Sequence, residues 1–357
     1  MVLRIKISNF RGFSGESREF MVGYPSLPDR GCVTSIVGDS ASGKSTIVSA
    51  LELMQAVARG VRTTEELHSG DLAAISAVVD KPSDISVSFS DRGVLYEYGF
   101  RFECSQMNRL WKIENEWLSV GDEQDKMSPV FARAGTLVKI GGLEGSDGTY
   151  ELDQKVFVLS TFASNDRSHP LLRARTYFAN LFIFGDKIGY LNDSIPTQRR
   201  PCYCWSRAEN LGAWLSFQMG ANPNFYRILA DGLRRYLVGF NRLVVSREPV
   251  TGDHLAVMFA SSNPGSISRI VPLWMLSSRE RMVFIGVILL TVGKVYAPTC
   301  VVSDDFDLIE EACPSLAAEI GRVYAGAGQL VALHKHNHKL YQRVLVNLNK
   351  EAHDVSH

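Results

Sequence analysis

The most constraining feature of the chain is a complete phosphate-binding loop near its beginning. The motif G-x-x-x-x-G-K-[ST] follows an apolar run at 33–37 and precedes a helix-prone run that opens with Thr46. A strand before the loop and a helix after it are the context in which this motif binds phosphate. The sequence therefore predicts a P-loop α/β fold with a nucleoside triphosphate as ligand. The loop consists of Gly38, Asp39, Ser40, Ala41, Ser42, Gly43, Lys44 and Ser45.

Each residue type in this loop has a chemical task. The two glycines let the backbone curl so that successive N–H groups point at phosphate oxygens, and the following helix N-terminus adds a partial positive charge. Lys44 is expected to reach the β- and γ-phosphates, and the Ser45 hydroxyl suits Mg²⁺. We therefore expect residues 38–46 to bind the nucleotide and Ser45 to contribute to a magnesium site.

Four further segments occur in a characteristic order. An N-F-R-G-F string at 9–13 follows a strand-like alternation, and an L-S-S-R-E string lies at 276–280. An apolar strand then ends in acids at 304–305, and a last apolar run at 329–333 precedes a histidine-rich segment. In this order the segments resemble the ABC-type ATPase heads of the RecF, SMC and OLD group. The closest resemblance, over most of the chain, is to compact bacterial AAA-type ATPases associated with abortive infection and phage defence.

The resemblance implies a role for each matching residue. Arg11 matches the arginine that approaches the nucleotide, and a guanidinium suits phosphate geometry. Ser277 matches the signature serine, which caps a helix and contacts the γ-phosphate held by the other subunit. Asp304 matches the Walker B acid, which holds Mg²⁺ through water. ATP and Mg²⁺ as cofactors, and a homodimer or higher homo-oligomer that closes over two nucleotides, follow from the same resemblance.

The sequence departs from the family pattern at three positions. Arg279 stands where the signature has a glycine, so it either replaces a backbone contact to phosphate or obstructs the dimer interface. Asp305 stands where the catalytic base is usually glutamate, and a base displaced by about 1 Å can cost on the order of 10²-fold in rate. The switch histidine is assigned to His336, although it lies one residue farther from Gln329 than expected, because the following residues 339–340 fall in step; His334 is the competing candidate. Slow hydrolysis is therefore expected, and nucleotide binding is the safer inference.

Composition narrows the function classes. The 357 residues contain 38 basic and 38 acidic side chains, so no overall field attracts nucleic acid or an anionic membrane. Six cysteines without a signal peptide suggest a reducing cytosol, and we expect a cytoplasmic protein with no membrane partner. The longest apolar run, at 282–292, is much shorter than the ~20 residues that span a bilayer and is expected to form a buried helix.

Local charge and metal-ligand clusters carry less weight. Arginine pairs at 199–200 and 234–235 and a third pair at 173 and 175 could form a basic patch, although short charge clusters are usually solvated surface. Cys202 and Cys204 lack the second pair that a structural zinc site needs. The alternating histidines at 334, 336 and 338 would share one face of a strand, but no cysteine or carboxylate lies near them in the sequence to complete a zinc site.

The resemblance, together with the order of expected elements, implies an ABC-ATPase-like head with a mixed central sheet, an antiparallel β subdomain and a helical insert. The amino-terminal lobe, residues 1–170, holds the P-loop and an antiparallel sheet predicted between about 85 and 158. The insert, 171–236, reads as helices without heptads. The carboxyl-terminal lobe, 237–357, carries the signature motif, the Walker B acid and the histidine switch.

Three functions fit these expectations. The first is an ATP-dependent molecular switch that dimerises on nucleotide and acts with a separately encoded effector, in bacterial defence or DNA maintenance. The second is a RecF-like DNA-repair ATPase that binds DNA directly across its dimer face. The third is a non-hydrolysing nucleotide-binding scaffold, toward which Arg279 and Asp305 tilt. A basic groove would favour the second function over the first.

Overall fold

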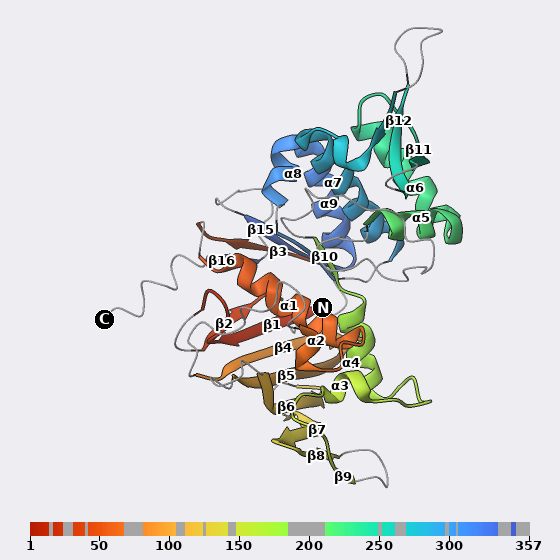
Figure 1. Cartoon of the computed structure of the whole chain (residues 1–357). Helices are drawn as coiled ribbons and strands as arrows, with labels where there is room; N and C mark the ends of the chain where they lie inside the picture. The colour runs from red at the N-terminus through yellow and green to blue at the C-terminus, as the bar shows by residue number, and fades with distance from the viewer. Residues whose placement is uncertain are drawn as a thin grey trace. The chain divides into compact units, whose positions relative to one another are not determined.

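The structure is a computed structural model that divides the chain into two compact units. Unit 1 comprises residues 1–30, 36–181 and 344–357, and unit 2 comprises residues 31–35 and 182–343. The elements of both are labelled in Figure 1. The three lobes expected from the sequence stay a prediction. The structure describes residues 1–13, 17–23, 31–39, 42–67, 81–104, 111–123, 126–141, 148–184, 211–248, 252–260, 269–296, 300–304, 306–334 and 344–347.

Unit 1 is built on an antiparallel sheet of eight strands, in the order β2-β1-β4-β5-β6-β7-β8-β9. A two-residue hairpin joins β4 to β5, where Arg92 and Gly93 have φ angles of 53° and 80°. Two central residues with positive φ match the twist of a two-residue hairpin. The predicted antiparallel sheet is thus confirmed. Its strands are β1 (Val2–Ser8), β2 (Arg18–Met21), β4 (Ser83–Asp91), β5 (Val94–Cys104), β6 (Trp111–Gly121), β7 (Ser128–Ala134), β8 (Leu137–Ile140) and β9 (Gly148–Glu151).

One face of this sheet is aromatic and buried. Alternate residues of β4 and β5, among them Phe89, Tyr98 and Phe100, are fully buried. The ring of Phe89 lies 4.2 Å from that of Tyr177 and 4.9 Å from that of Phe178, so α4 packs on this face. Such pairs contribute about 0.5–1.5 kcal/mol beyond their buried area. The helices of unit 1 are α1 (Lys44–Ala58), α2 (Thr64–Leu67), α3 (Val158–Thr161) and α4 (Pro170–Ala179).

Two arginines tie α1 to α4 reciprocally. Arg59, just after α1, donates from Nε to the carbonyl of Ala179, the last residue of α4, at 2.9 Å. Arg175 of α4 donates from Nε to the carbonyl of Ala58, the last residue of α1, at 3.0 Å. Cations are favourable at helix C-termini, where carbonyls lack partners inside the helix. The helix that follows the P-loop is therefore fixed at its far end.

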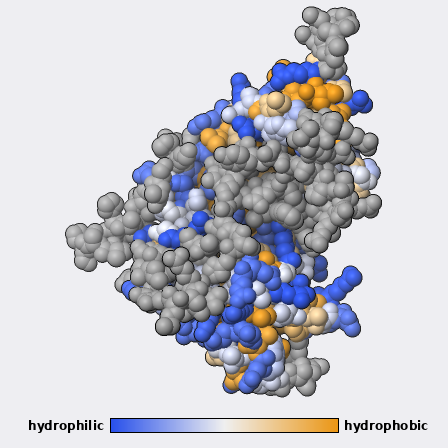
Figure 2. Space-filling model, viewed as in Figure 1, coloured by the Kyte–Doolittle hydropathy of each residue, from blue (hydrophilic) through white to orange (hydrophobic). Residues whose placement is uncertain are grey.

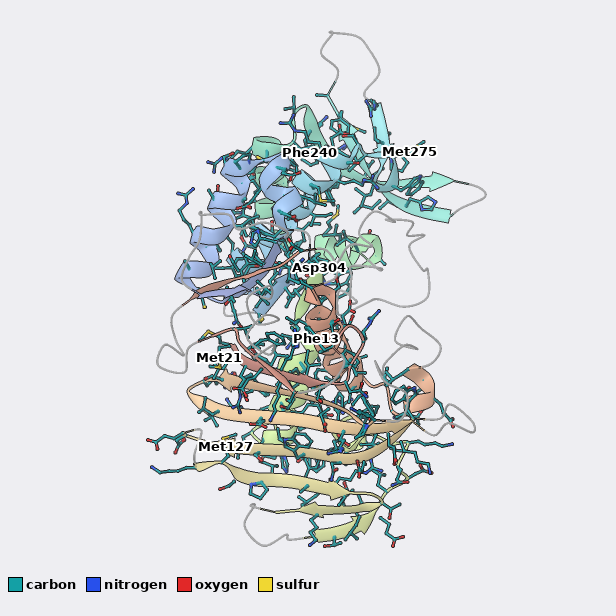
Figure 3. The ribbon with its side chains drawn as sticks, turned by 90° about the vertical axis from the view of Figure 1, so that its left-hand side faces the viewer. Phe13, Met21, Met127, Phe240, Met275 and Asp304 are labelled. Atoms are coloured by element: carbon teal, nitrogen blue, oxygen red, sulfur yellow. The ribbon has the colours of Figure 1, made fainter. Side chains whose placement is uncertain are left out.

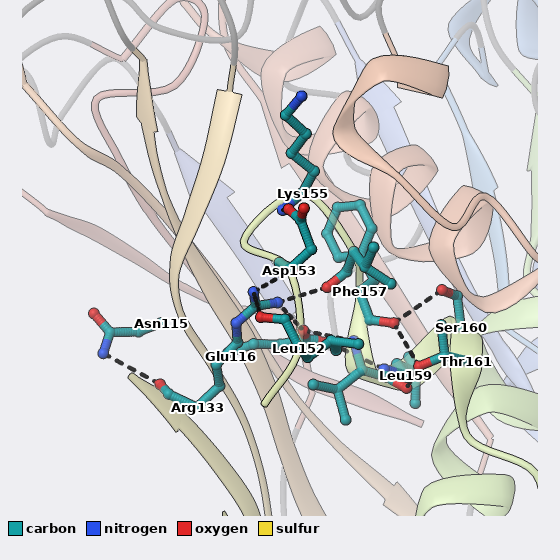
Figure 4. Close-up of polar contacts among 12 residues, drawn as sticks. Asn115, Glu116, Arg133, Leu152, Asp153, Lys155, Phe157, Leu159, Ser160 and Thr161 are labelled. Carbon is teal, nitrogen blue, oxygen red and sulfur yellow. Dashed lines mark hydrogen bonds and ion pairs between the residues drawn. The ribbon is translucent and has the colours of Figure 1, made fainter. Parts of the chain in front are cut away.

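A buried ion pair holds the segment after β9 against the sheet. Glu116 Oε2 lies 3.9 Å from Arg133 Nη1, and both side chains are 0% exposed. The Glu116 carboxylate accepts the backbone N–H groups of Val158 and Leu159 and the hydroxyl of Tyr98. Figure 4 shows Glu116 beside Arg133, together with carbonyls of the segment after β9 to which Arg133 donates. Burial raises the pKa of Glu116, while its hydrogen bonds act in the opposite direction.

A second sheet has five strands in the order β10-β14-β15-β3-β16, and it includes residues 32–35, near the beginning of unit 2. Strand β14 runs parallel to β10 and β15, with Ser303 opposite Phe184 and Ala332. Strands β3, β14 and β15 are buried along their whole length, as expected of a sheet covered on both faces. The strands are β3 (Cys32–Val37), β10 (Phe182–Phe184), β14 (Cys300–Ser303), β15 (Gln329–His334) and β16 (Val344–Asn347).

Helix α7 forms the centre of unit 2. The predicted buried helix is confirmed, because every residue from Val283 to Gly293 is buried. A Cβ at Gly286 would lie 2.7 Å from a methyl of Leu316 and 2.9 Å from one of Ile309, so the missing side chain lets α8 and α9 pack closely. The helices are α5 (Leu211–Ala221), α6 (Pro223–Tyr236), α7 (Ser278–Val295), α8 (Phe306–Ala312) and α9 (Pro314–Gly326).

Unit 2 also carries a small antiparallel sheet, β11 (Phe240–Glu248), β12 (Gly252–Phe259) and β13 (Arg269–Pro272). Figure 2 shows hydrophobic surface around β11 and β12. Exposed apolar side chains of this unit include Val245, which is 49% exposed, and Met275, which is 65% exposed. None of the helices within the described ranges is long and apolar enough to cross a membrane.

Candidate functional site

The described part of the P-loop has the expected local geometry. Strand β3 ends at Val37, and α1 begins at Lys44. Gly43 has a φ of 97°, a left-handed conformation that side chains other than glycine's rarely adopt, and its carbonyl accepts the N–H of Thr46 at 2.9 Å. The predicted residues Ser40 and Ala41 lie outside the described residues. A glycine turn that opens directly into a helix is the backbone that a phosphate cradle needs.

The Lys44 side chain lies over its own loop. Its Nζ donates to the carbonyl oxygens of Gly38 and Asp39, the latter at 2.8 Å, and lies 3.5 Å from Ser42 Oγ. These carbonyls hold the cation at the loop, where it can exchange them for phosphate oxygens. The Lys44 ammonium thus lies against the backbone of the loop, and its contact with phosphate stays a prediction.

The N-F-R-G-F segment packs directly on the P-loop and α1. Gly12 N–H donates to Thr46 Oγ1 at 3.3 Å, and Arg11 Nη1 donates to Ser49 Oγ. The Phe13 ring occupies the space in which a Cβ at Gly43 would lie, and Figure 3 shows its position. Arg11 thus lies beside the helix that follows the loop, and its approach to a nucleotide stays a prediction.

The sequence analysis did not predict two residues of the contact between the N-F-R-G-F segment and α1. Phe13 fills the space beside Gly43, and Ser49 holds Arg11. Ser49 lies three residues after Thr46, so both hydroxyls fall on one face of α1, and this spacing could have revealed it. No sequence signal pairs Phe13 with Gly43, because their contact depends on how the two segments fold together.

In unit 2, the residue predicted to be the Walker B acid lies at a strand end. Asp304 follows β14 directly, its N–H donates to the Phe184 carbonyl at 2.8 Å, and its side chain is partly exposed (Figure 3). Ligands of open α/β sheets bind at the carboxyl ends of strands. The proposed base Asp305 lies outside the described residues. Asp307, the next acid, is buried, and its Oδ1 accepts the N–H of Leu308 at 3.1 Å within α8.

Of the two candidates for the switch histidine, only His334 lies among the described residues. His334 ends β15 and is 4% exposed, with Nδ1 lying 3.6 Å from Glu310 Oε2 of α8 and the Phe306 ring at 5.8 Å. It is therefore a core residue that packs on the helix after Asp304. His336 and His338 lie outside the described residues. Within the described ranges, no group of three or more histidine, cysteine or acidic side chains could hold a metal ion.

The signature turn forms a complete helix cap. Ser277 is the N-cap of α7, with its Oγ accepting the N–H of Glu280 at 3.3 Å. The Glu280 carboxylate in turn accepts the N–H of Ser277 at 2.8 Å and its hydroxyl at 2.7 Å. This reciprocal arrangement is a capping box. Arg279 is exposed, and its Nε donates to the carbonyl of Ala312 in α8 at 3.3 Å.

Each unit, taken by itself, carries donors of the kinds that a magnesium nucleotide requires. Unit 1 supplies a left-handed glycine at the start of α1, a helix N-terminus, the Lys44 cation and the Ser45 hydroxyl. Unit 2 supplies the Asp304 carboxylate at a strand end. Phosphate seeks N–H groups and cations, and Mg²⁺ seeks hydroxyl and carboxylate oxygens beside phosphate.

The arginine clusters that could have formed a basic patch are largely engaged. Arg173 lies 3.2 Å from Asp91, and Arg175 donates to a carbonyl at the end of α1. Arg234 lies 2.9 Å from Asp231, and Arg235 lies 2.8 Å from Glu319. The pair at 199–200 lies outside the described residues. The described clusters therefore add little support for a nucleic-acid surface.

Comparison with known proteins shows the fold. No protein-family model matches the sequence, and no curated protein matches it. A solved SMC head bound to the C-winged helix domain of ScpA aligns with 97% of this chain and 94% of its own, at 12% identity and a TM-score of 0.52. A Pyrococcus furiosus Smc head with an extended coiled coil, bound to the C-terminal domain of ScpA, covers 94% and 90% at 12% identity, with a TM-score of 0.49.

An SMC head domain from Thermotoga maritima aligns at 13% identity over 94% of this chain and 89% of its own, with a TM-score of 0.39. The first of these likenesses confirms the expected mixed α/β head fold of the SMC type. The finer resemblance to ATPases of abortive-infection systems does not appear among these structures.

Proposed function

We propose that this protein is an ATP-binding, ABC-type ATPase that uses Mg²⁺ and acts as a nucleotide-dependent switch. The observation that carries the proposal is the P-loop of unit 1, where Gly43 is left-handed at the start of α1 and Lys44 lies over the loop. The N-F-R-G-F segment packed on the same helix, and the SMC-head fold, support it. A bare glycine turn would need neither the lysine nor the packed segment.

In this proposal each residue has one task. Lys44 and the N–H groups of the loop bind the phosphates, Ser45 and Asp304 hold Mg²⁺, and Arg11 approaches the nucleotide. Bound Mg²⁺ supplies positive charge against the phosphates. Asp305 orients the attacking water and His336 senses the γ-phosphate, with turnover slowed by the shorter acid.

The switch is proposed to be a homodimer or higher homo-oligomer that closes over two nucleotides. Ser277 of one copy would then contact the γ-phosphate held by the other. Met275, exposed two residues before Ser277, gives this surface an apolar component of the kind that association buries. A separately encoded effector, in bacterial anti-phage defence, would respond to the closed state. The solved SMC head bound to ScpA shows one such fold with a partner protein.

The direct test of the proposal is ATP binding by Lys44→Ala. Charged hydrogen bonds contribute about 1.5–3 kcal/mol, and about 1.4 kcal/mol is tenfold in affinity, so the Kd for ATP should rise roughly 10- to 100-fold. Calorimetry measures it, with circular dichroism to show that the fold is intact. Lys155→Ala is the matched control, because that lysine of unit 1 pairs with Glu65 at 2.6 Å and should leave ATP binding unchanged. Equal affinities in wild type and Lys44→Ala would overturn the P-loop assignment.

A further inference from the structure

Arg279 is the residue of the signature turn that the expected pattern does not explain. It occupies the first turn of α7, where the positive end of the helix dipole disfavours a cation. A hydrogen-bond acceptor nearby would offset this unfavourable position. The structure supplies one, because Arg279 Nε lies 3.3 Å from the carbonyl of Ala312.

Ala312 is the last residue of α8, so its carbonyl is one of the four that a helix leaves without an internal partner. The negative end of the α8 dipole lies at the same place. Arg279 therefore caps the C-terminus of a second helix, while Ser277, two residues earlier, caps the N-terminus of α7. One short turn thus fixes the ends of two helices.

The contact extends an existing line of packing between α7 and α8. Gly286 lies seven residues after Arg279, so both fall on one face of α7, and a Cβ at Gly286 would lie 2.9 Å from Ile309 of α8. Ile309 and Ala312 are three residues apart and share one face of α8. Helix α8 also contacts β15 through Glu310 and His334. Only its C-terminal end depends on the Arg279 side chain.

Helix α8 begins two residues after Asp304, so a shift of α8 would act on the segment that carries the proposed Walker B carboxylate. We propose that Arg279 is a positioning residue that joins the signature turn to the Walker B segment within one chain, by capping α8. This inference rests on the proposed function in assigning Asp304 to Mg²⁺. It replaces the two roles expected from the sequence, a phosphate ligand and an obstruction at the dimer interface.

The first experiment needs no nucleotide. Arg279→Met keeps the aliphatic stem and removes the donor, so amide hydrogen exchange in the last turn of α8 and at Cys313 should become several-fold faster. Arg279→Lys, which retains a cation that can donate to a carbonyl, should restore much of the protection. Arg322→Met is the matched control, because this exposed arginine donates only to the Ala318 carbonyl of its own helix among the contacts described. Unchanged exchange in Arg279→Met would overturn the inference.

The second experiment separates the three roles with ATP and Mg²⁺. If Arg279 acts through α8, Arg279→Met lowers kcat on the order of tenfold. It also raises the Mg²⁺ concentration needed for half-maximal turnover, while the Kd for ATP and ATP-dependent association in an Asp305→Asn background stay within twofold. Weakened ATP-dependent association would mean that Arg279 is a phosphate ligand. Stronger association with faster turnover would mean that Arg279 obstructs the dimer interface. Either result would overturn the inference. A chain that binds no ATP would refute the proposed function, and the exchange measurement would still decide whether Arg279 holds α8.

Discussion

At the scale of single residues, burial rather than charge decides which ion pairs matter here. Glu116 and Arg133 are fully buried, whereas the pair of Glu114 and Arg101 lies at 2.9 Å with 48% and 41% of the side chains exposed. Exposed pairs contribute roughly 0–1 kcal/mol, and removing one partner of a buried pair costs about 3–5 kcal/mol. Two glutamates on one strand are thus expected to differ strongly.

This difference gives a stability prediction. Glu116→Gln should lower the free energy of unfolding by about 3 kcal/mol, the low end of the range for buried pairs because Arg133 keeps its carbonyl partners. Glu114→Gln, the matched control, should cost less than about 1 kcal/mol. Urea unfolding followed by circular dichroism measures both. Similar losses for the two variants would show that burial does not govern the pair.

Sequence alternation could not have identified Glu116. Ile113 is buried, so a strict period of two would place Asn115 on the buried face and Glu116 in solvent. The pairing of β5 with β6 shifts register between Phe102 opposite Ile113 and Arg101 opposite Asn115, which leaves Glu114 as an extra residue. A β-bulge of this kind exchanges the two faces downstream of it. The buried glutamate is therefore a consequence of pairing and not of local pattern.

At the scale of elements, α4 begins with an unusual cap. His169 is its N-cap, and the imidazole Nδ1 accepts the N–H of Leu171 at 3.1 Å. Only the neutral imidazole has a lone pair for this bond. Burial lowers the pKa of His169, and Asp166 acts in the opposite direction. A depressed pKa in the folded state means that the cap contributes fully above the unfolded value of about 6.5 and is lost as pH falls through the folded value.

A pH-dependent stability follows from this cap. Between about pH 7.5 and about pH 5, the wild type should lose up to ~1 kcal/mol more stability than His169→Asn, which caps without titrating. His169→Ala should be about 1 kcal/mol less stable at neutral pH and should lack this part of the pH dependence. Thermal unfolding across the pH range measures all three proteins. Parallel curves for wild type and His169→Asn would contradict the role of the cap.

Elements were more predictable than their contacts. The helix after the P-loop, the buried helix α7 and the antiparallel sheet each carry a local signal, namely a motif, an apolar run or an alternation. The helix after the signature string has its capping box at Ser277 and Glu280. The contact from Arg279 to Ala312 joins residues from two helices, so no spacing in the sequence could have predicted it.

At the scale of the whole molecule, the proposed site is incomplete in one copy. The signature serine and the P-loop are expected to meet only across a two-fold interface, so ATP would contact both copies. ADP lacks the γ-phosphate, and a ligand shifts an equilibrium only through contacts that differ between the two states. The triphosphate should therefore favour the closed dimer.

Nucleotide-dependent association is the corresponding prediction. Light scattering of Asp305→Asn should report a doubled mass with ATP and a single chain with ADP or without nucleotide. Adding Ser277→Arg should weaken the association through bulk and like charge beside Arg279. Ser128→Arg, an exposed serine of unit 1, is the matched control and should have no effect. A constant mass in all conditions would instead favour the scaffold function.

Strand β3 has a consequence for how the protein is made. Residues 31–35 are grouped with unit 2, and the N–H of Cys32 donates to the Gly328 carbonyl at 2.9 Å. The ribosome therefore produces β3 long before its neighbour β15. The strand that leads into the P-loop cannot pair with β15 until most of unit 2 has been synthesised. A fragment cut to residues 182–343 would lack β3 and leave the edge of β15 unpaired, which invites aggregation. Nucleotide capture is thus expected late in synthesis, and neither unit is expected to be recovered by truncation at a single point.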